Sequence, residues 1–511
     1  MHRPPTGRLA PSALRLGSAL AVGLAWLGLA GCGERAPEAK ATDERPNVLF
    51  LVVDDLLPQL GCYGVEGAST PSMDALARSG QLFERAYCQV ALCQPSRASV
   101  LSGTRPATNQ VYDLQTPFRR ALPDIVSLPQ LFREQGYTTY ALGKVHHGRA
   151  PEGEQPDWSA TPWRPEGGQL SYASAEYEAA LEHWRARGEL EPLGAGPYPL
   201  LSTEAPDVPD EALPDGQIAA AALEHLRALA AREEPFFLAV GFLKPHLPFV
   251  APAAYWERHP PESVPAVARL EPPSGAPAAA LPQGGETRQY FDLRGLRSYP
   301  PAVRQRLRRG YRAAVSYADA QVGKLLDALD ELGLEDDTIV VLWGDHGWHL
   351  GEQGTWGKMT NFEAATRVPL LLRAPGHTRA GARSEALVEL VDLYPTLAEL
   401  CALPLPDHLE GASLAPLLSD PDREWKSAVF SELRRPDRRA GELWGRSIRT
   451  PRYRLTQWSR GASPNFALEL YDYAEGEAEV LNVARRSEYA DQVRELTRRL
   501  EQGWSSARPK R

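Results

Sequence analysis

The run Asn47-Val48-Leu49-Phe50-Leu51-Val52-Val53-Asp54-Asp55 decides the fold class of this chain. Its continuous apolar stretch, rich in branched side chains, predicts a strand that is buried on both faces of a sheet. The stretch ends at Asp54 and Asp55, two adjacent carboxylates that are costly to bury unless a positive group compensates them. Because ligands of open α/β sheets bind where strands end, the pair indicates a divalent cation with oxygen ligands. A surface turn or a helix cap is the alternative for these two residues taken alone.

The same order of buried strand, polar cluster and helix recurs along the chain. The later strands are followed by Lys144 and His147, then by His246, then by Asp345 and His346. This recurrence predicts a doubly wound, mostly parallel α/β sheet with helices on both faces and a site along one edge. The further strands are expected at 137–142, 235–241, 338–343 and 368–372, and the helices at 71–77, 95–102, 127–135, 218–231 and 311–332.

Two irregular stretches, and a change in the pattern of apolar residues after about residue 420, divide the chain further. Residues 149–212 and 251–300 are rich in proline, have weak periodicity and are predicted to be surface insertions. After about residue 420 the pattern changes to shorter alternating strands. The sequence therefore predicts a main domain at 47–420 and a smaller C-terminal α+β subdomain with an antiparallel sheet at 421–511. The strands of this subdomain are expected at 446–450, 453–458 and 468–473, and its final helix at 489–502.

The N-terminus has the pattern of a targeting signal rather than of a folded element. Three arginines precede an apolar run at 16–30, which is too short to span a bilayer and ends in Leu29-Ala30-Gly31-Cys32. This pattern resembles a bacterial lipoprotein signal, which implies a signal peptide at 1–31, lipidation of Cys32 and a flexible tether at 32–46. The protein is then expected to be exported and held at a membrane by its lipid alone, in the periplasm or at the cell surface. A plain secretory signal is the alternative.

Composition excludes several other classes of protein. The chain of 511 residues has a net charge of -9 and no dense block of lysine and arginine, which excludes a nucleic-acid partner. None of its 5 cysteines forms a Cys-x-x-Cys pair, so a zinc–thiolate site is not expected. The cysteines are too few for a disulfide scaffold, although Cys62 and Cys88 remain candidates for one bond.

Cys93 lies at a predicted helix start. Pro95 suits the first helical position, and Gly103 ends the helix. A helix N-terminus carries unpaired N–H groups and partial positive charge, so it favours a bound anion. Arg97 adds a fork of donors that suits a tetrahedral oxyanion. The alternative is that Cys93 is a small buried apolar residue.

The stretch Cys93-Gln94-Pro95-Ser96-Arg97, followed by Leu101-Ser102-Gly103, resembles the signature of the sulfatase family, in which the cysteine is oxidised to formylglycine. The resemblance extends from Asn47 to about Leu418 and implies an alkaline-phosphatase-like fold. Within the family several segments are most similar to the iduronate 2-sulfatases, which implies hydrolysis of the 2-O-sulfate of a uronic acid in a sulfated glycan. These segments are Asp54-Asp55-Leu56, Gly61-Cys62-Tyr63-Gly64, Gly143-Lys144-Val145 with His147, and residues 241–249 and 345–358.

The resemblance implies a divalent metal as cofactor. This metal is calcium in most members of the family, and magnesium or manganese are the alternatives because a histidine among the ligands is unusual for calcium. The ligands implied in this sequence are Asp54, Asp55, Asp345, His346 and the modified residue at position 93.

The resemblance also implies catalytic roles and partners. The hydrated aldehyde at position 93 would attack sulfur, and His246 would protonate the departing sugar oxygen. His147 would then take the proton from the second hydroxyl, which releases sulfate. The implied partners are a sulfated oligosaccharide substrate and a maturation enzyme that generates formylglycine. The negative charge on the sulfate oxygens would be stabilised by the metal and by three cationic side chains, those of Arg97, Lys144 and Lys358.

Two positions depart from the iduronate pattern and leave the substrate open. Thr104 stands where a basic residue is usual, and His349 stands where a small residue is usual. The insertions at 149–212 and 251–300 also match poorly. The alternatives are therefore a sulfatase for another sulfated sugar, a phosphomonoester or phosphonate hydrolase of the same superfold, and a non-catalytic glycan-binding lipoprotein.

Overall fold

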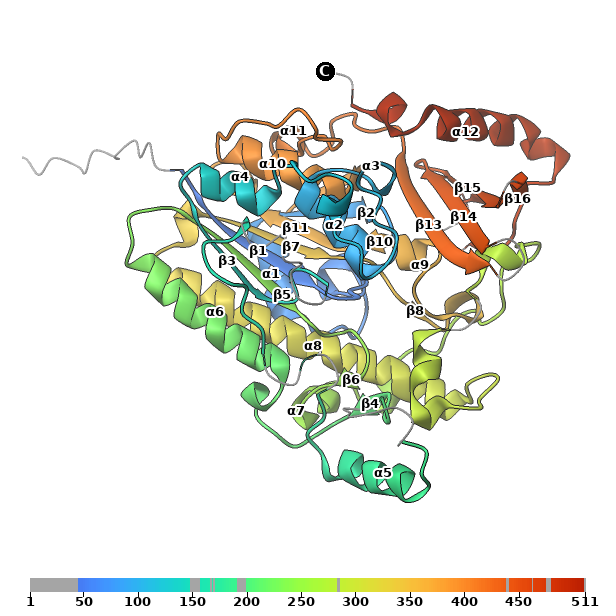
Figure 1. Ribbon diagram of the computed structural model, residues 1–511, viewed down its shortest axis with the longest axis horizontal. Helices are drawn as coiled ribbons and strands as arrows, with labels where there is room; N and C mark the ends of the chain where they lie inside the picture. Colours follow the sequence, from blue (N-terminus) through green and yellow to red (C-terminus); the bar gives the residue numbers. More distant parts are fainter. Residues whose placement is uncertain are drawn as a thin grey trace, which may run out of the picture. The chain divides into compact units, whose positions relative to one another are not determined.

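The computed structural model (Figure 1) describes residues 45–511 apart from the short stretches given at the end of this paragraph. Residues 45–511 form one compact unit, and the predicted boundary at residue 420 stays a prediction. The predicted signal peptide, Cys32 and most of the tether lie outside the described residues. The stretches left out are 148–156, 166–167, 169–170, 191–198, 283–284, 438–440, 462, 475–478 and 510–511.

The centre of the unit is a sheet of eight strands, of which four run parallel side by side. β1 (Asn47–Val53) lies between β5 (Phe236–Phe242) and β7 (Thr338–Gly344), and β3 (Thr138–Gly143) lies beyond β5. All seven residues of β5 and of β7 are buried, which is why they read as unbroken apolar runs. The remaining strands on the far side of β7 are β11 (Leu370–Arg373), β2 (Gln81–Tyr87), β10 (Arg367–Val368) and β12 (Ala382–Glu389).

Helices cover both faces of this sheet, as predicted (Figure 1). Leu49, Leu51 and Val53 of β1 pack with one set of helices, and Val48 and Phe50 pack with the other set. Alternate side chains of a strand point to opposite faces, so β1 is buried in two separate cores. The first face is covered by α1 (Pro71–Ser79), α6 (Pro214–Ala230) and α8 (Pro301–Glu331), and the second by α2 (Cys93–Ser102), α4 (Leu128–Glu134), α10 (Leu393–Leu400) and α11 (Ala415–Ser419).

Three features of the main sheet differ from the expectation. Strands β2 and β12 have no counterpart in the sequence prediction, and β11 runs antiparallel to β7. The two missed strands carry charged side chains that pair with each other, as Arg85 does with Glu385 at 3.0 Å. Such strands lack the continuous apolar run that marks a fully buried strand.

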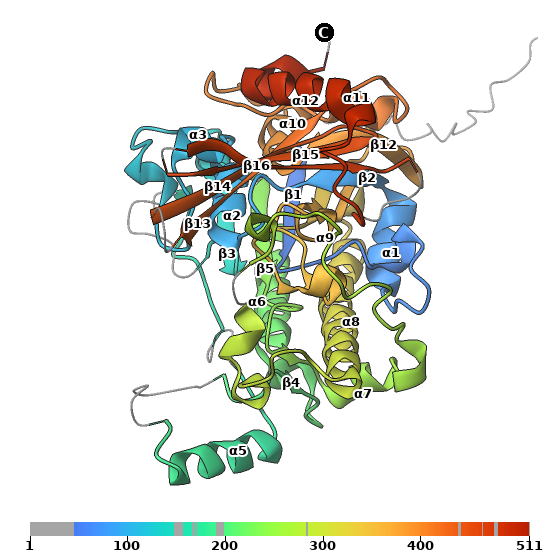
Figure 2. The ribbon, with the colours of Figure 1, turned by 90° about the vertical axis from the view of Figure 1, so that its right-hand side faces the viewer.

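The C-terminal residues form an antiparallel sheet of four strands, which confirms the predicted type of structure (Figure 2). The helix α12 (Ala490–Gln502) packs on its middle strands, and Leu455, Leu496 and Leu500 belong to the core between them. The first strand was not predicted. The strands are β13 (Val429–Asp437), β14 (Gly441–Arg449), β15 (Tyr453–Arg460) and β16 (Ser463–Asp472).

The two predicted insertions contain more structure than expected. α8 begins at Pro301, ten residues before the predicted start at residue 311. The described part of 149–212 includes the helix α5 (Ala175–Ala186) and the strand β4 (Thr203–Glu204). β4 pairs with β6 (Phe249–Val250), which directly precedes the second insertion. The backbone N–H of Phe291 donates to the carbonyl oxygen of Pro199, so the two insertions meet. The remaining short elements are α3 (Pro106–Asn109), α7 (Ala253–Glu257), β8 (His349–Leu350), β9 (Trp356–Gly357) and α9 (Glu363–Thr366).

Cys62 and Cys88 are free thiols, so the candidate disulfide does not form in this structure. Among the described residues, no helix has the length and apolar character that crossing a membrane requires.

Candidate active site

The carboxyl ends of the central strands bring most of the predicted site residues to one edge of the sheet. β1, β5 and β7 are parallel and end in register, so the residues that follow them emerge side by side. We call the resulting group the strand-end cluster. It comprises Asp54 and Asp55 after β1, Lys144 after β3, His246 after β5, Asp345 and His346 after β7, Lys358 after β9, and Cys93 and Arg97 of α2.

Two glycines allow the strands β3 and β5 to approach closely at this edge. Gly143 ends β3 with a φ of 71°, which lies in the left-handed region that glycine adopts without strain. A Cβ at Gly241 would collide with the backbone carbonyl of Lys144. The chain can therefore turn Lys144 into the cluster only because both positions lack a side chain.

α2 presents the thiol of Cys93 at its first turn. The helix begins at Cys93. Pro95 is therefore its third residue, whereas the sequence predicted that Pro95 would be the first. It ends before Gly103, whose φ of 67° provides the left-handed cap that the sequence predicted. Both Cys93 and Arg97 are 1% exposed.

Arg97 ties the carboxylates of two strands together. Its Nη2 donates to Asp54 Oδ1 at 2.9 Å, and its Nε donates to Asp345 Oδ2 at 2.9 Å. Its Nη1 donates to the carbonyl oxygens of Lys144 and Val145. These contacts make Arg97 a positioning residue for the carboxylates, and direct contact with a substrate oxygen stays a prediction.

The thiol of Cys93 lies among charged groups. Lys358 Nζ is 3.4 Å and Lys144 Nζ is 4.0 Å from Sγ, and His346 Nε2 is 3.3 Å away. A cysteine that merely fills an apolar core has apolar neighbours, as Cys88 does in the core that α2 and α4 cover. The surroundings of Cys93 therefore favour a chemical role over a packing role.

The cluster contains a donor set that fits a divalent cation. One ligand atom from each of Asp54, Asp55, Cys93 and His346 lies within 4.8 Å of the others. Asp55 Oδ2 is buried, lies 3.9 Å from His246 Nε2 and has no hydrogen-bond partner among the described residues, so a bound cation would satisfy it. Asp345 stands beside this set, with Oδ2 at 3.6 Å from His346 Nε2.

The pKa values of the two adjacent carboxyl groups are shifted in opposite directions. Burial raises the pKa of Asp54, but Lys144, His246 and Arg97 outweigh burial and hold it well below the ordinary value. Burial is also the largest influence on Asp55 and raises its pKa well above the ordinary value, although Lys358 opposes the rise. A divalent charge between the two carboxylates would relieve the cost of ionising both.

His246 is held at both ring nitrogens. Nδ1 is 2.7 Å from the carbonyl oxygen of Leu247, and Nε2 is 3.1 Å from Glu286 Oε1. Lys244 supports the same turn, since its ammonium donates to the carbonyl oxygen of His246 at 2.9 Å. The imidazole is thereby fixed at the edge of the cluster. Burial, and then the charges of Lys358 and Lys144, lower its pKa well below the ordinary value, so its role as a proton donor stays a prediction.

Glu286 is a residue of this site that sequence reasoning missed. Its Oε2 is 3.5 Å from Lys358 Nζ, and its side chain is 24% exposed, so it lies between the buried cluster and solvent. It belongs to a short 3₁₀-helix, Glu286–Gln289, inside the second predicted insertion. No periodic pattern marks that region, so the sequence carried no signal for it.

His147 lies beside the cluster after β3. Burial, and then the charge of Lys144, lower its pKa to about 4, so its ring is neutral at physiological pH. Its Nδ1 has no hydrogen-bond partner in the described part of the chain. A neutral imidazole with an open nitrogen is suited to accept a proton.

The two positions that depart from the iduronate pattern have structural partners. Thr104 Oγ1 lies 2.7 Å from the hydroxyl of Ser102 at the end of α2. His349 Nε2 lies 2.8 Å from the hydroxyl of Thr360 and is fully buried.

The fold and the site together define a hydrolase of the alkaline-phosphatase-like α/β type, with cations, carboxylates and a thiol converging on a buried edge. Residues 46–402 match the model of the sulfatase family, and residues 351–505 match the model of the C-terminal region of N-sulphoglucosamine sulphohydrolase. The chain therefore belongs to the sulfatase family and is a sulfuric ester hydrolase.

Among characterised proteins, the chain is similar to iduronate 2-sulfatase of Homo sapiens, with 37% identity over 75% of this chain and 75% of that protein. It is 33% identical to iduronate 2-sulfatase of Mus musculus over 87% of this chain and 90% of that protein. Among solved structures it resembles a phosphonate monoester hydrolase of Agrobacterium radiobacter, with 27% identity, a TM-score of 0.72, and coverage of 90% of this chain and 95% of that one.

Proposed function

We propose that this sulfatase removes the 2-O-sulfate of a uronic acid in a sulfated glycan. The observation that carries the proposal is the convergence of metal-binding side chains and cations on Cys93, in a chain similar to two iduronate 2-sulfatases over most of its length. A sulfate monoester is an anion, and the buried cations of this site are the groups that can receive one.

The metal of the proposed mechanism would be held by Asp54, Asp55, Asp345 and His346 with residue 93. When bound, a divalent cation, with calcium as the first expectation and magnesium or manganese as alternatives, supplies positive charge that stabilises the sulfate oxygens. The orphaned Asp55 Oδ2 supports such a ligand set.

Cys93 is proposed to act after oxidation to formylglycine, whose hydrated aldehyde supplies the nucleophile. The side chain is 1% exposed, so the maturation enzyme would have to act before the chain has folded around it. This order fits the proposed export as a lipoprotein, with Cys32 lipidated and residues 1–31 removed.

The chain's own residues divide the remaining work. Lys144 and Lys358, both within 4.0 Å of Cys93 Sγ, would neutralise charge on the sulfate oxygens. His246, held at its Nδ1 by the Leu247 carbonyl, would protonate the sugar oxygen as it leaves. His147 would accept the proton whose loss releases sulfate, since its ring is neutral and its Nδ1 is open.

A second candidate is hydrolysis of phosphate or phosphonate esters. The structural similarity to the phosphonate monoester hydrolase favours it, because the same cluster of cations and carboxylates can serve both anions. A third candidate, a glycan-binding lipoprotein without catalysis, requires an unmodified Cys93.

The test compares ester classes and then sulfate positions. Enzyme produced in a host with the maturation enzyme is assayed on 4-nitrophenyl sulfate, phosphate and phenylphosphonate, then on uronyl disaccharides with a 2-O-sulfate or only a 6-O-sulfate. We expect preference for the sulfate ester and for the 2-O-sulfated sugar. Preference for the phosphorus esters would refute the proposal.

The state of residue 93 is read in the same preparation by mass spectrometry of the tryptic peptide 86–97. This peptide carries both Cys88 and Cys93, so fragmentation compares the two residues in one molecule. We expect an aldehyde at 93 and a thiol at 88. A thiol at both positions, together with glycan binding and no turnover, would favour the binding lipoprotein.

A further inference from the structure

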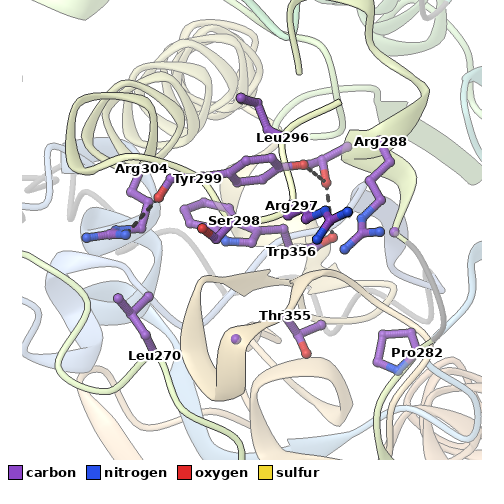
Figure 3. Close-up of a pocket in the computed structure, with 13 residues that line it drawn as sticks. Leu270, Pro282, Arg288, Leu296, Arg297, Ser298, Tyr299, Arg304, Thr355 and Trp356 are labelled. Carbon is purple, nitrogen blue, oxygen red and sulfur yellow. Dashed lines mark hydrogen bonds between the residues drawn. The ribbon is translucent and has the colours of Figure 1, made fainter. Parts of the chain in front are cut away.

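A pocket of about 190 Å³ is lined by residues that neighbour Glu286 and Lys358 along the chain, and it has no role in the chemistry described above (Figure 3). Its wall includes residues on both sides of Glu286, namely Gly285 and Thr287, and also Trp356. Trp356 is two residues before Lys358. The two chain segments that carry Glu286 and Lys358 into the site therefore also form the wall of this pocket.

Three arginines line the pocket, and no acidic residue does. Figure 3 shows Arg288 and Arg297 at one end of the pocket and Arg304 at the other. Within the described part of the chain, none of these three forms an ion pair. Like charges that share a pocket repel one another, and a bound anion with several oxygens relieves this cost.

Neighbouring arginines of α8 behave differently. Arg306 pairs with Asp292 at 2.7 Å, and Arg308 pairs with Glu352 at 3.0 Å. Within the described part of the chain, the guanidinium of Arg304 in the same helix donates to the carbonyl oxygen of Tyr299, at 2.7 Å, and forms no ion pair. The two carboxylates come from segments outside α8, and neither of them pairs with Arg304. Arg309 and Arg312 of the same helix also donate to backbone carbonyl oxygens alone within the described residues, so the distinguishing feature of Arg304 is its place in the pocket.

The pocket also offers an aromatic surface. The rings of Tyr299 and Trp356 lie 5.4 Å apart and are tilted by 59°, and both line the pocket. The hydroxyl of Tyr299 donates to Thr287 Oγ1 at 2.9 Å, which fixes this ring against the 3₁₀-helix of Glu286. An aromatic wall with guanidinium groups at both ends suits a sugar ring that packs its apolar C–H face on the aromatic rings and carries anionic groups, better than an extended peptide.

We propose that this pocket is a second subsite, which binds a sulfated or carboxylated sugar of the same glycan, beyond the disaccharide whose uronate is desulfated. The inference rests on the proposed function, because the sugar in the pocket belongs to the same chain as the sulfate at Cys93. The enzyme would then act on glycan chains of more than one disaccharide and select those with a second anionic group.

The test uses matured enzyme with a double substitution, Arg288→Gln with Arg297→Gln, and a matched control, Arg78→Gln, which removes an exposed arginine of α1. The substrates are a heparan-type tetrasaccharide with a terminal 2-O-sulfated uronate and the corresponding disaccharide. We expect kcat/KM for the tetrasaccharide to fall at least about tenfold more than for the disaccharide in the double variant. The control variant should have the wild-type kcat/KM for both substrates.

Binding to the Cys93→Ala variant separates this proposal from the proposed function. Calorimetry with the tetrasaccharide, with and without the double substitution, should show about a tenfold loss of affinity even if no sulfate is released from either substrate. Equal effects on the tetrasaccharide and the disaccharide, or no effect on either, would overturn the second subsite. The assignment to a sugar would be overturned if an oligoglutamate peptide bound as tightly as the tetrasaccharide and the double substitution lowered both affinities equally.

Discussion

Two buried charge clusters of this protein both combine carboxylates with arginine and lysine but differ in how their carboxylate oxygens are satisfied. We call the second one the Glu389 cluster; it consists of Glu389, Asp392, Arg105 and Lys426, all less than one-tenth exposed. Each of its four carboxylate oxygens accepts two hydrogen bonds, from Arg105, from Lys426 or from backbone N–H groups. In the strand-end cluster, Asp55 Oδ2 accepts none from the described residues.

This difference separates a structural role from a chemical one. A cluster whose carboxylate oxygens are all bonded offers none of them to a ligand, whereas a buried carboxylate oxygen without a hydrogen-bond donor costs stability until something binds it. The Glu389 cluster also ends β12, where Glu389 and Asp392 form a capping box for the short helix that follows. We therefore expect substitutions in the Glu389 cluster to destabilise the fold and substitutions in the strand-end cluster to abolish activity.

The largest effect is expected for Cys93→Ala. Loss of the nucleophile should lower the turnover of a sulfate ester by roughly 10⁴-fold, while the melting temperature stays close to that of the wild type because one small side chain replaces another. The matched control is Cys88→Ala, which removes a buried thiol five residues away and should keep its activity. Activity of Cys93→Ala near the wild-type level would refute the mechanism.

The next effect concerns stability. Burial raises the pKa of Glu389, but Arg105 and Lys426 outweigh it and lower the pKa from 4.5 to about 2. Because the pKa is lower in the folded state, the stabilisation is complete above about pH 4.5 and is lost as the pH falls toward 2. Glu389→Gln should therefore lower the free energy of unfolding by about 3 kcal/mol at pH 7.

Urea unfolding at pH 7, 4.5 and 3 measures this prediction. The difference between the wild type and Glu389→Gln should shrink as the pH falls. A difference that is small at pH 7, or that grows in acid, would show that the cluster does not stabilise the fold.

The smallest of the three effects is expected for His246→Ala. Loss of the proton donor should lower kcat on a 2-O-sulfated uronate roughly 100-fold, and should lower kcat on 4-nitrophenyl sulfate less, because nitrophenolate leaves without a proton. His377→Ala, which removes an exposed histidine, is the control. Equal losses on both substrates would argue against His246 as the proton donor.

The central strands and their polar ends could be predicted from the sequence because β1, β5 and β7 are buried on both faces. Burial forces an unbroken apolar run, and the first polar residue then marks the edge of the sheet where ligands bind. This reasoning located Asp54, His246 and Asp345 without knowledge of any contact.

Two strands and one site residue could not be predicted from the sequence because their positions depend on tertiary contacts. β2 and β12 were missed because Glu84 and Arg85 pair with residues of β12 and interrupt the apolar pattern. Glu286 was missed because a 3₁₀-helix in an irregular region carries no period, and only its packing beside β9 brings it to His246.

The most direct test of the account is calorimetric titration of Ca²⁺ into protein first dialysed against a chelator, with Mg²⁺ and Mn²⁺ as comparisons. The variant is Asp55→Asn, and the control is Asp319→Asn, a buried carboxylate that accepts from the backbone N–H groups of Ser72 and Met73. We predict that the wild type and the control bind a divalent cation and that Asp55→Asn binds it at least about 100-fold more weakly. A wild-type protein that binds no divalent cation, or an Asp55→Asn variant that binds as the wild type does, would contradict the account.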